Sequence, residues 1–422
     1  MRGSVDHRWL PATFDNPNDR TLSPVSVDCS FCSRRISGNP GLICSGDMTL
    51  LTVNSGSTSV KLALYDTDPA GSLTRVAMEH HSGGDVEART TLGTLAAKLG
   101  SDPQAIAHRV VHGGTRFVRP TRLDPDVIAA IERLSPLAPL HNPEALRWVA
   151  AAHEVWGART PQVAVFDTAF FANLPRVAAE YAVPERLGVG LGVRRYGFHG
   201  LAHETMWQAW CDLYPHLPQG GRLITLQLGG GCSIAAIRRG QPLDTSMGFS
   251  PLEGLVMATR SGDVDPAIVP YLERQLASSG DEIVALLNSQ CGLAGMSATD
   301  GNPATLLVDP APQAQFAVEL YCYRIRKYLG AYLAVLEGCD GIVFGGGVGE
   351  HVPEVRARAL AGLAWAGITL DPSLNAQARG GPQRIDGTDR GVRVHVVAVD
   401  EESVLARAAA ELTCASGASN PR

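Results

Sequence analysis

The feature that most constrains the fold is the stretch at residues 49–66, where two apolar runs flank a turn of small residues. The apolar runs predict the two strands of a β-hairpin. The turn, residues 54–59, reads Asn-Ser-Gly-Ser-Thr-Ser, and Lys61 follows it. Glycine lets backbone N–H groups approach an anion and the hydroxyls donate further hydrogen bonds, so the turn is a candidate phosphate cradle. An ordinary hairpin turn explains this stretch equally well when it is taken alone.

A second stretch, at residues 222–245, repeats this layout, with a small-residue turn at residues 229–233 between two apolar runs. A third small-residue turn, at residues 345–349, follows a short predicted strand and precedes a helix that we expect to begin near Pro353. Helix N-termini attract anions, so this third turn suits a nucleotide. The three turns together resemble the phosphate-binding scheme of the actin-like ATPase and sugar-kinase superfamily. That resemblance implies a duplicated two-lobe α/β fold of the ribonuclease H-like type, with the active site in the cleft between the lobes.

The chain has 422 residues, which is enough for two domains with cores of their own. Residues 1–47 are rich in Pro, Ser, Asn, Asp and Arg without sustained periodicity, so we expect a flexible N-terminal extension that need not belong to the native fold. We assign residues 48–168 together with residues 400–422 to lobe I, and residues 169–399 to lobe II.

Charge and composition argue against two classes of partner. The net charge of −6 gives no basic surface for nucleic acid. No apolar run reaches the roughly 18 residues of a membrane span. The nine cysteines are an odd number and mostly isolated, so we expect reduced thiols and a cytoplasmic protein.

Several polar side chains stand where a cleft is expected. Arg109 lies between apolar residues of a predicted strand; because an unpaired buried guanidinium is costly, it either points into a cleft toward an anion, which we favour, or forms a structural salt bridge. Asp167 ends a buried strand, where a carboxylate holds a metal-bound water or positions a substrate. His199 is a candidate donor to a transferring phosphoryl group. His141, in a proline-rich loop, is either a ligand contact or a turn residue.

Two further loops contribute charge. Arg260 lies in a turn-rich loop among small residues, which suits a mobile guanidinium that closes over developing charge. The acids at residues 400–402 follow a predicted strand at residues 393–399 and precede a helix, so they are helix caps or include a magnesium ligand. Asn142, before Pro143, is the predicted N-cap of another helix.

Taken in order, these stretches resemble the acetate kinase family over residues 48–412. The motifs that carry the resemblance are VNSGSTSVK, HRVVHGG, PLAPLHNP, VFDTAF, RRYGFHG, MGFSPLEG, TRSGDVDP, FGGGVGEHVPEVR and DEE. The resemblance implies a phosphotransferase with a carboxyl acceptor. It would transfer the γ-phosphoryl group of ATP to acetate, reversibly and by direct in-line transfer, giving acetyl phosphate and ADP. It also implies a homodimer and a need for Mg²⁺, with Mn²⁺ as an alternative metal.

The same resemblance implies roles for individual residues. The catalytic residues would be Asp167, His199, Arg260 and Arg109. The substrate would be bound by Arg109, Val111, Leu140, His141, Phe198 and Pro251. The nucleotide would be bound by Ser57, Ser59, Lys61, Leu228, Gly229, Gly230, Gly231, Cys232, Ser233, Asp300, Gly301, Asn302, Gly347, Val348, Gly349, Glu350 and His351. The metal ligands would be Asn54 and Glu401.

The chain also departs from the family pattern near the nucleotide and the back of the cleft. The departures are Gly230 and His351 in place of asparagine, Asn302 in place of arginine, and Gln227 and Phe171 in place of histidine. Gly347 and Val348 leave room for adenosine, so we keep ATP as the expected phosphoryl donor rather than pyrophosphate.

Three alternatives stay open. The first is a kinase for propionate or another short-chain acid. The pocket residues alone do not separate it from an acetate kinase, because one methylene changes the binding free energy by only about 1–3 kcal/mol. A degenerate paralogue that binds nucleotide without turnover would explain the losses at Gly230 and Asn302. A non-catalytic regulator on the same fold would need a DNA-binding helix-turn-helix, for which residues 1–47 show no helical periodicity.

Overall fold

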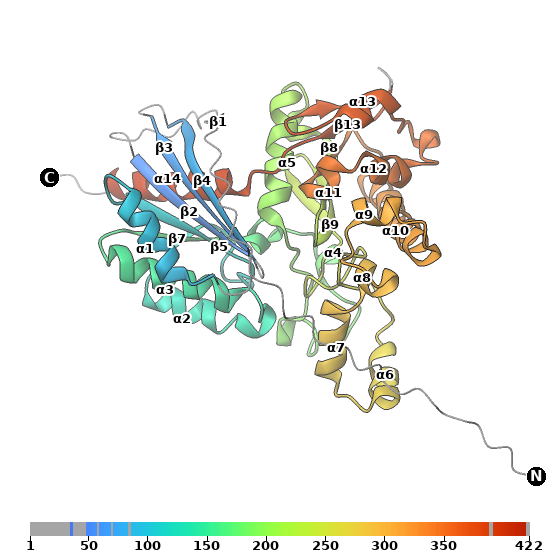
Figure 1. Ribbon diagram of the computed structural model, residues 1–422, viewed down its shortest axis with the longest axis horizontal. Helices are drawn as coiled ribbons and strands as arrows, with labels where there is room; N and C mark the ends of the chain where they lie inside the picture. Colours follow the sequence, from blue (N-terminus) through green and yellow to red (C-terminus); the bar gives the residue numbers. More distant parts are fainter. Residues whose placement is uncertain are drawn as a thin grey trace, which may run out of the picture.

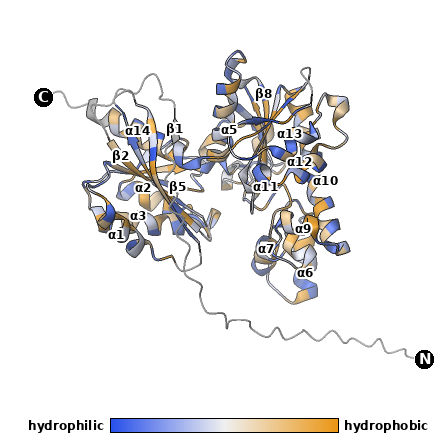
Figure 2. Cartoon of the chain, turned by 45° about the horizontal axis from the view of Figure 1, so that its top comes forward, coloured by the Kyte–Doolittle hydropathy of each residue, from blue (hydrophilic) through white to orange (hydrophobic). Residues whose placement is uncertain are grey.

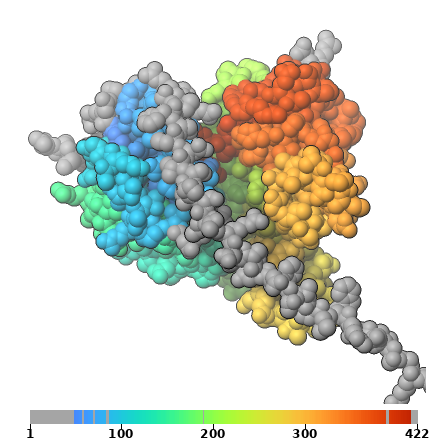
Figure 3. Space-filling model, viewed as in Figure 1, coloured from blue at the N-terminus to red at the C-terminus, as the bar shows by residue number. Residues whose placement is uncertain are grey.

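Two mixed β-sheets, each covered by helices on both faces, make up the two lobes of the molecule, which lie side by side (Figures 1 and 3). The computed structural model describes residues 34–36, 48–56, 59–68, 71–82, 86–387 and 391–418. Ser57, one of the predicted phosphate-binding residues, lies outside the described residues.

Sheet A, in lobe I, has its strands in the order β1-β4-β3-β2-β5-β7-β6. The strands are β1 (Arg34–Ile36), β2 (Met48–Ser55), β3 (Ser59–Thr67), β4 (Leu73–Ser82), β5 (Ala105–Val110), β6 (Thr121–Arg122) and β7 (Gln162–Phe166). The segment that we expected to be a flexible extension thus supplies an edge strand, β1, which pairs antiparallel with β4.

Sheet B, in lobe II, has the order β10-β9-β8-β11-β13-β12. Its strands are β8 (Arg222–Leu228), β9 (Cys232–Arg238), β10 (Gln241–Thr245), β11 (Gly341–Gly345), β12 (Gln383–Arg384) and β13 (Arg393–Val396). The predicted strand at residues 393–399 therefore ends earlier, at Val396.

The two sheets share one plan, as the duplicated pattern predicts. In each, an antiparallel hairpin (β2–β3 or β8–β9) carries a third antiparallel strand on one side. On its other side follow two parallel strands, β5 and β7 or β11 and β13. A short antiparallel strand, β6 or β12, closes the row. Both predicted phosphate hairpins are confirmed as hairpins, with Asn54 opposite Lys61 in the first and Leu228 opposite Cys232 in the second.

Sheet A is buried between two layers of helices. Leu51 and Val53 of β2 face α1 (Ala88–Lys98) and α3 (Asn142–Trp156), whereas Leu50 faces α14 (Glu401–Ala418). This alternation is what a strand buried on both faces requires. Helix α2 (Pro125–Glu132) packs beside α3. The red helix α14 lies among the blue strands of lobe I, although it comes from the other end of the chain (Figure 1).

Sheet B has the same layering. Helix α5 (Gly200–Leu213) packs Met206 and Trp210 on one face, and α10 (Pro312–Leu336) covers the other. The strands at the centre of both sheets are coloured mostly as hydrophobic in Figure 2. The remaining helices are α4 (Arg176–Ala179), α6 (Ile268–Leu276), α7 (Gly280–Ser289), α8 (Gly292–Ser297), α9 (Pro303–Val308), α11 (Gly346–His351), α12 (Pro353–Leu360) and α13 (Pro372–Gln377).

Three local expectations need correction. The glycine run at residues 345–349 is not a loop before a helix, because most of it forms the short helix α11. Glycine lets this segment approach β8 closely. A Cβ on Gly346 would lie only 2.6 Å from the Leu228 carbonyl oxygen. Asn142 does not cap α3. The buried side-chain amide of Asn142 instead accepts from the backbone N–H of His112 (3.1 Å) and donates to the backbone carbonyl of His112 (3.0 Å).

The third correction concerns the thiols. Cys414 is disulfide-bonded, so our expectation of reduced cysteines throughout is wrong for this residue. Cys211, Cys232, Cys291, Cys322 and Cys339 are free thiols. Within the described part of the chain, no helix is both long enough and apolar enough to cross a membrane.

Candidate active site

A charged cluster forms where the parallel strands β2, β5 and β7 end at the same edge of sheet A. Asn54 stands near the end of β2, Arg109 near the end of β5, and Asp167 directly after β7. Arg109 donates through Nε and Nη2 to both carboxylate oxygens of Asp167, at 3.1 and 2.7 Å, and through Nη1 to Oδ1 of Asn54 at 3.2 Å. The structural salt bridge that we placed second for Arg109 is therefore present, and it holds the guanidinium in a fixed orientation.

The N-terminus of α14 adds two acids to this cluster. The side-chain amide of Asn54 donates to Glu401 (2.7 Å) and to Glu402 (2.9 Å), and the ammonium group of Lys61 lies 3.6 Å from Glu402. Sequence reasoning named Glu401 and missed Glu402. The adjacent acids of the DEE motif were the available signal, but helix periodicity alone does not show that both side chains reach the strand.

The charged groups in this cluster shift one another's pKa values. Burial alone would raise the pKa of Glu401, but Arg109, Lys61 and the hydrogen bond from Asn54 outweigh burial and hold that pKa below its usual range. The Glu402 carboxylate is the main reason that the pKa of Lys61 is raised. Glu401 is therefore ionised at neutral pH and Lys61 is protonated, so carboxylate and ammonium groups stand together at the end of the first hairpin.

Lobe II contributes His199 and a hydrogen-bonded row behind it. His199 immediately precedes α5 and adopts a left-handed backbone conformation (φ 57°). Its Nδ1 lies 2.9 Å from the Ser233 hydroxyl, which lies 2.8 Å from Nε2 of His203. Nδ1 of His203 lies in turn 2.7 Å from the hydroxyl of Thr225 on β8. Ser233 was predicted as a nucleotide ligand, whereas His203 and Thr225 carry no local pattern that marks them as partners of His199.

Arg260 meets His199 at the turn of the second hairpin. A Cβ built on Gly231 would lie 3.2 Å from His199 Cε1 and 3.5 Å from Arg260 Nη1, so glycine turn, imidazole and guanidinium are neighbours. Arg260 donates to the carbonyl of Pro251 at 3.3 Å, and no carboxylate pairs with it among the residues that the structure describes. Burial lowers its pKa. Arg260 is thus a largely buried cation without an anionic partner in the described ranges of the chain.

The residues predicted to bind the acyl group differ in their surroundings. Burial lowers the pKa of His141 to about 4, and the positive charges of Arg109 and Arg260 act in the same direction. Val111 and Phe198 are buried in one apolar cluster, and Pro251 contacts Arg260 through its carbonyl. Leu140 differs from them, because 65% of its surface is exposed.

Of the predicted nucleotide residues, Ser59 and Lys61 lie on β3 of lobe I, and those from Leu228 onward lie on three segments of lobe II. The turn Gly229–Gly231 is closed by a hydrogen bond from Gly229 N–H to the Gly231 carbonyl (3.0 Å), and Leu228, Cys232 and Ser233 flank it on β8 and β9. Helix α11 carries Gly347, Val348, Gly349, Glu350 and His351. The third segment, Asp300, Gly301 and Asn302, precedes α9.

Two of these residues have structural partners of their own. The side chain of Asn302 caps α9 by accepting from the Ala304 N–H at 3.0 Å. The carboxylate of Glu350 accepts from the N–H groups of Gly346 (3.2 Å) and Val399 (3.1 Å), which joins α11 to the segment after β13. In contrast, a Cβ on Gly230 or Gly347 would meet no atom within 4 Å, so both glycines border open space.

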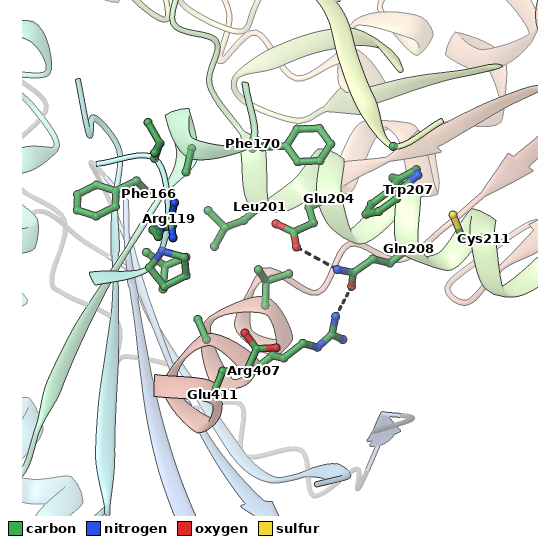
Figure 4. A pocket seen from close by; sticks show the side chains of 18 of the residues that line it. Arg119, Phe166, Phe170, Leu201, Glu204, Trp207, Gln208, Cys211, Arg407 and Glu411 are labelled. Carbon is green, nitrogen blue, oxygen red and sulfur yellow. Dashed lines mark hydrogen bonds between the residues drawn. The ribbon is translucent and has the colours of Figure 1, made fainter. Parts of the chain in front are cut away.

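A cavity of about 670 Å³ lies behind the charged cluster, at the joint between the lobes (Figure 4). Phe166 and Phe170, on either side of Asp167, line it together with Leu201 from the start of α5. Across it, Gln208 of α5 donates to Glu204 (3.0 Å) and accepts from Arg407 of α14 (2.6 Å). This polar contact ties a helix of lobe II to a helix of lobe I.

Comparison with known proteins places the chain among enzymes of one kind. A family described as the Acetokinase family matches residues 72–407. The acetate kinase of Solibacter usitatus is 45% identical over 311 residues, which are 73% of this chain and 75% of the relative. The acetate kinase of Streptomyces avermitilis is 41% identical over 388 residues, covering 85% of this chain and 96% of the relative.

Solved structures of acetate and propionate kinases have a fold similar to that of this chain. The acetate kinase of Porphyromonas gingivalis has a TM-score of 0.75 and 33% identity, with 86% of this chain and 99% of that chain covered. A propionate kinase from Francisella tularensis has a TM-score of 0.75 and 30% identity, with 86% of this chain and 98% of that chain covered.

Proposed function

Because this chain belongs to the acetokinase family, we propose that it catalyses reversible transfer of the γ-phosphoryl group of ATP to acetate, giving acetyl phosphate and ADP. It is a phosphotransferase whose acceptor is a carboxyl group. Two observations carry the proposal. His199 and Arg260 are neighbours at the turn of the second hairpin, and Arg260 has no acidic partner among the described residues. Asp167, whose carboxylate accepts from Arg109, also accepts from the backbone N–H of His199.

This arrangement suits phosphoryl transfer to a carboxylate. Acetate is already ionised at neutral pH, so the enzyme needs no strong base, and its task is to position two anions and neutralise the charge between them. Arg260 supplies a cation for the charge that develops in the transition state. His199 supplies a neutral donor, because burial, together with Arg109 and Arg260, lowers its pKa to about 3.

Asp167 acts in this proposal as an orienting group. Its two-point contact with Arg109 supports the orienting role over a role as proton acceptor, because both of its oxygens already accept from that guanidinium. Burial raises the pKa of Asp167, and Arg109 opposes that rise. Arg109 in turn offers the outer side of its guanidinium to the substrate carboxylate or to the phosphoryl group.

The donor set at the end of β2 fits a magnesium ion shared with phosphates. Mg²⁺ prefers one or two carboxylates and completes its shell with waters and phosphate oxygens. Glu401 and Glu402 place carboxylate oxygens on either side of one Asn54 amide. The described residues contain no group of three or more His, Cys, Asp or Glu side chains that would hold a metal alone. We propose that Asn54 and Glu401 hold the ion, which when bound neutralises phosphate charge.

ATP and ADP are the nucleotide substrates of the family, and the departures of this chain are compatible with them. Gly230 leaves space where the family pattern has an asparagine side chain, and Asn302 stabilises its own helix instead of presenting a guanidinium. We therefore expect nucleotide binding through the backbone of the Gly229–Gly231 turn and through α11, with Ser59 and Lys61 reaching the phosphates from lobe I. A homodimer in the cytoplasm remains our expectation from the family resemblance.

A hydroxamate-trapping assay tests the function directly. The purified protein is supplied with acetate, propionate or butyrate, each with ATP, GTP or pyrophosphate. We expect the highest kcat/KM with acetate and ATP, because the curated relatives that cover most of the chain are acetate kinases. A higher value with propionate would identify a propionate kinase, whereas turnover at background with every pair would identify a degenerate paralogue. Activity with another donor alone would make Gly230 and Asn302 the determinants of donor choice.

A further inference from the structure

The row of hydrogen bonds behind His199 is buried throughout. Thr225, Ser233 and His203 have no exposed surface, and they come from β8, β9 and α5. The row runs from His199 Nδ1 through the Ser233 hydroxyl and the His203 imidazole to the Thr225 hydroxyl, with successive distances of 2.9, 2.8 and 2.7 Å. The opposite nitrogen of His199, Nε2, lies beside Gly231 and Arg260 at the cleft.

Each member of this row has one hydrogen to donate. Burial lowers the pKa of both His199 and His203 to about 3, so both imidazoles are neutral at pH 7 and each carries a single N–H. Each hydroxyl has one O–H as well. The row therefore has two possible directions, and the direction decides which nitrogen of His199 carries its hydrogen.

Only one direction satisfies every buried donor. If the Thr225 hydroxyl donates to His203 Nδ1, then His203 Nε2–H donates to Ser233, and Ser233 donates to His199 Nδ1. In the reverse direction His203 Nδ1–H donates to Thr225, whose own hydroxyl hydrogen then finds no acceptor among the described residues. A buried donor without an acceptor is costly, so the first direction is favoured.

We propose that Thr225, His203 and Ser233 are positioning residues that fix His199 in the tautomer with its hydrogen on Nε2. This tautomer presents an N–H to the space beside Gly231 and Arg260, where an anion is stabilised. The other tautomer would present a lone pair there and repel an oxygen of the phosphoryl group. The proposal rests on the proposed function for its effect on catalysis, but the tautomer itself does not depend on any substrate.

Two variants at one position test the effect on catalysis. Thr225→Val removes the hydroxyl at nearly constant shape, and Thr225→Ser keeps it. Removal of one hydrogen-bond donor to a transition state lowers kcat by about 10²–10³. The valine variant keeps the imidazole and loses only the preference for the Nε2–H tautomer, so we expect a smaller fall in kcat, roughly 10- to 100-fold. The KM for ATP should be nearly unchanged. The serine variant should stay within about threefold of the wild type. Equal kcat values for the two variants would refute the proposal.

Nuclear magnetic resonance of the ¹⁵N-histidine-labelled wild-type protein, without substrates, measures the tautomer directly. His199→Asn identifies the signal of His199 by its loss. We expect Nε2–H in the wild type and a gain of Nδ1–H in Thr225→Val. Nδ1–H in the wild type would overturn the proposal even if neither Thr225 variant folds. Inactivity with all substrates, combined with the expected tautomer, would instead count against the proposed function.

Discussion

Replacement of Arg260 by alanine is expected to lower kcat by about three to five orders of magnitude, the range found when an arginine that stabilises a phosphoryl-transfer transition state is removed. Arg260 pairs with no carboxylate in the described part of the protein, and burial lowers its pKa. Its charge is therefore held ready for an anion. The loss should appear in kcat more than in the KM for ATP, because the interaction is strongest in the transition state.

The same variant should fold normally. Arg260 has no acidic partner among the described residues, so its removal leaves no buried carboxylate uncompensated and also removes the cost of desolvating the guanidinium. We expect a melting temperature within a few degrees of the wild type, measured by calorimetry on the same preparations used for kinetics. Arg260→Lys is the matched control, since it keeps the charge and loses the planar fork. A kcat within tenfold of the wild type for Arg260→Ala would remove Arg260 from the mechanism.

Replacement of Arg109 by alanine should abolish measurable turnover and also destabilise the protein. Arg109 is paired with Asp167 through two hydrogen bonds and lies next to Asn54, and its positive charge also lowers the pKa of Glu401. Without it, Asp167 is a buried carboxylate with no cation. Breaking a buried pair in this way costs about 3–5 kcal/mol of the free energy of unfolding. Denaturant unfolding of both proteins measures this cost.

The origin of that cost can be checked in two ways. The double variant Arg109→Ala with Asp167→Asn should recover part of the lost stability, since it removes the uncompensated charge. The deficit of the single variant should also shrink as pH is lowered. Without Arg109 the folded-state pKa of Asp167 lies above its unfolded value, so the penalty is absent when both states are protonated and complete above the folded pKa. A deficit that stays constant with pH would place the loss in packing instead.

Local patterns in the sequence were sufficient for the frame of the site. Apolar runs around small-residue turns predicted both hairpins, and the predicted strands placed Arg109 and Asp167 at a cleft, whereas the role of Asn54 came from the family resemblance. These predictions succeed because a strand fixes the direction of its side chains and parallel strands end at one edge. The motif order along the chain was then enough to identify the family.

Residues that act through distant partners were not predictable in this way. Glu402 reaches Asn54 and Lys61 across hundreds of residues, and Thr225 reaches His203 only because β8 and α5 pack together. A threonine in a strand and a histidine in a helix carry no local mark of such a contact. The helical form of the glycine run at α11 was missed for a similar reason, since glycine disfavours a helix unless packing against a neighbouring strand demands it.

The position of α14 in the chain has a consequence for biosynthesis. Glu401 contacts Asn54 across 347 positions, and Val404, Leu405 and Ala409 of the same helix cover the apolar face of sheet A. At roughly 5–20 residues per second, the ribosome needs about 17–70 s to travel from one end of this contact to the other. Sheet B can be assembled during that interval except for its last strands, while one face of sheet A waits uncovered. The lobe translated first is therefore completed last, and chaperones that bind exposed apolar strands should meet the nascent chain at sheet A.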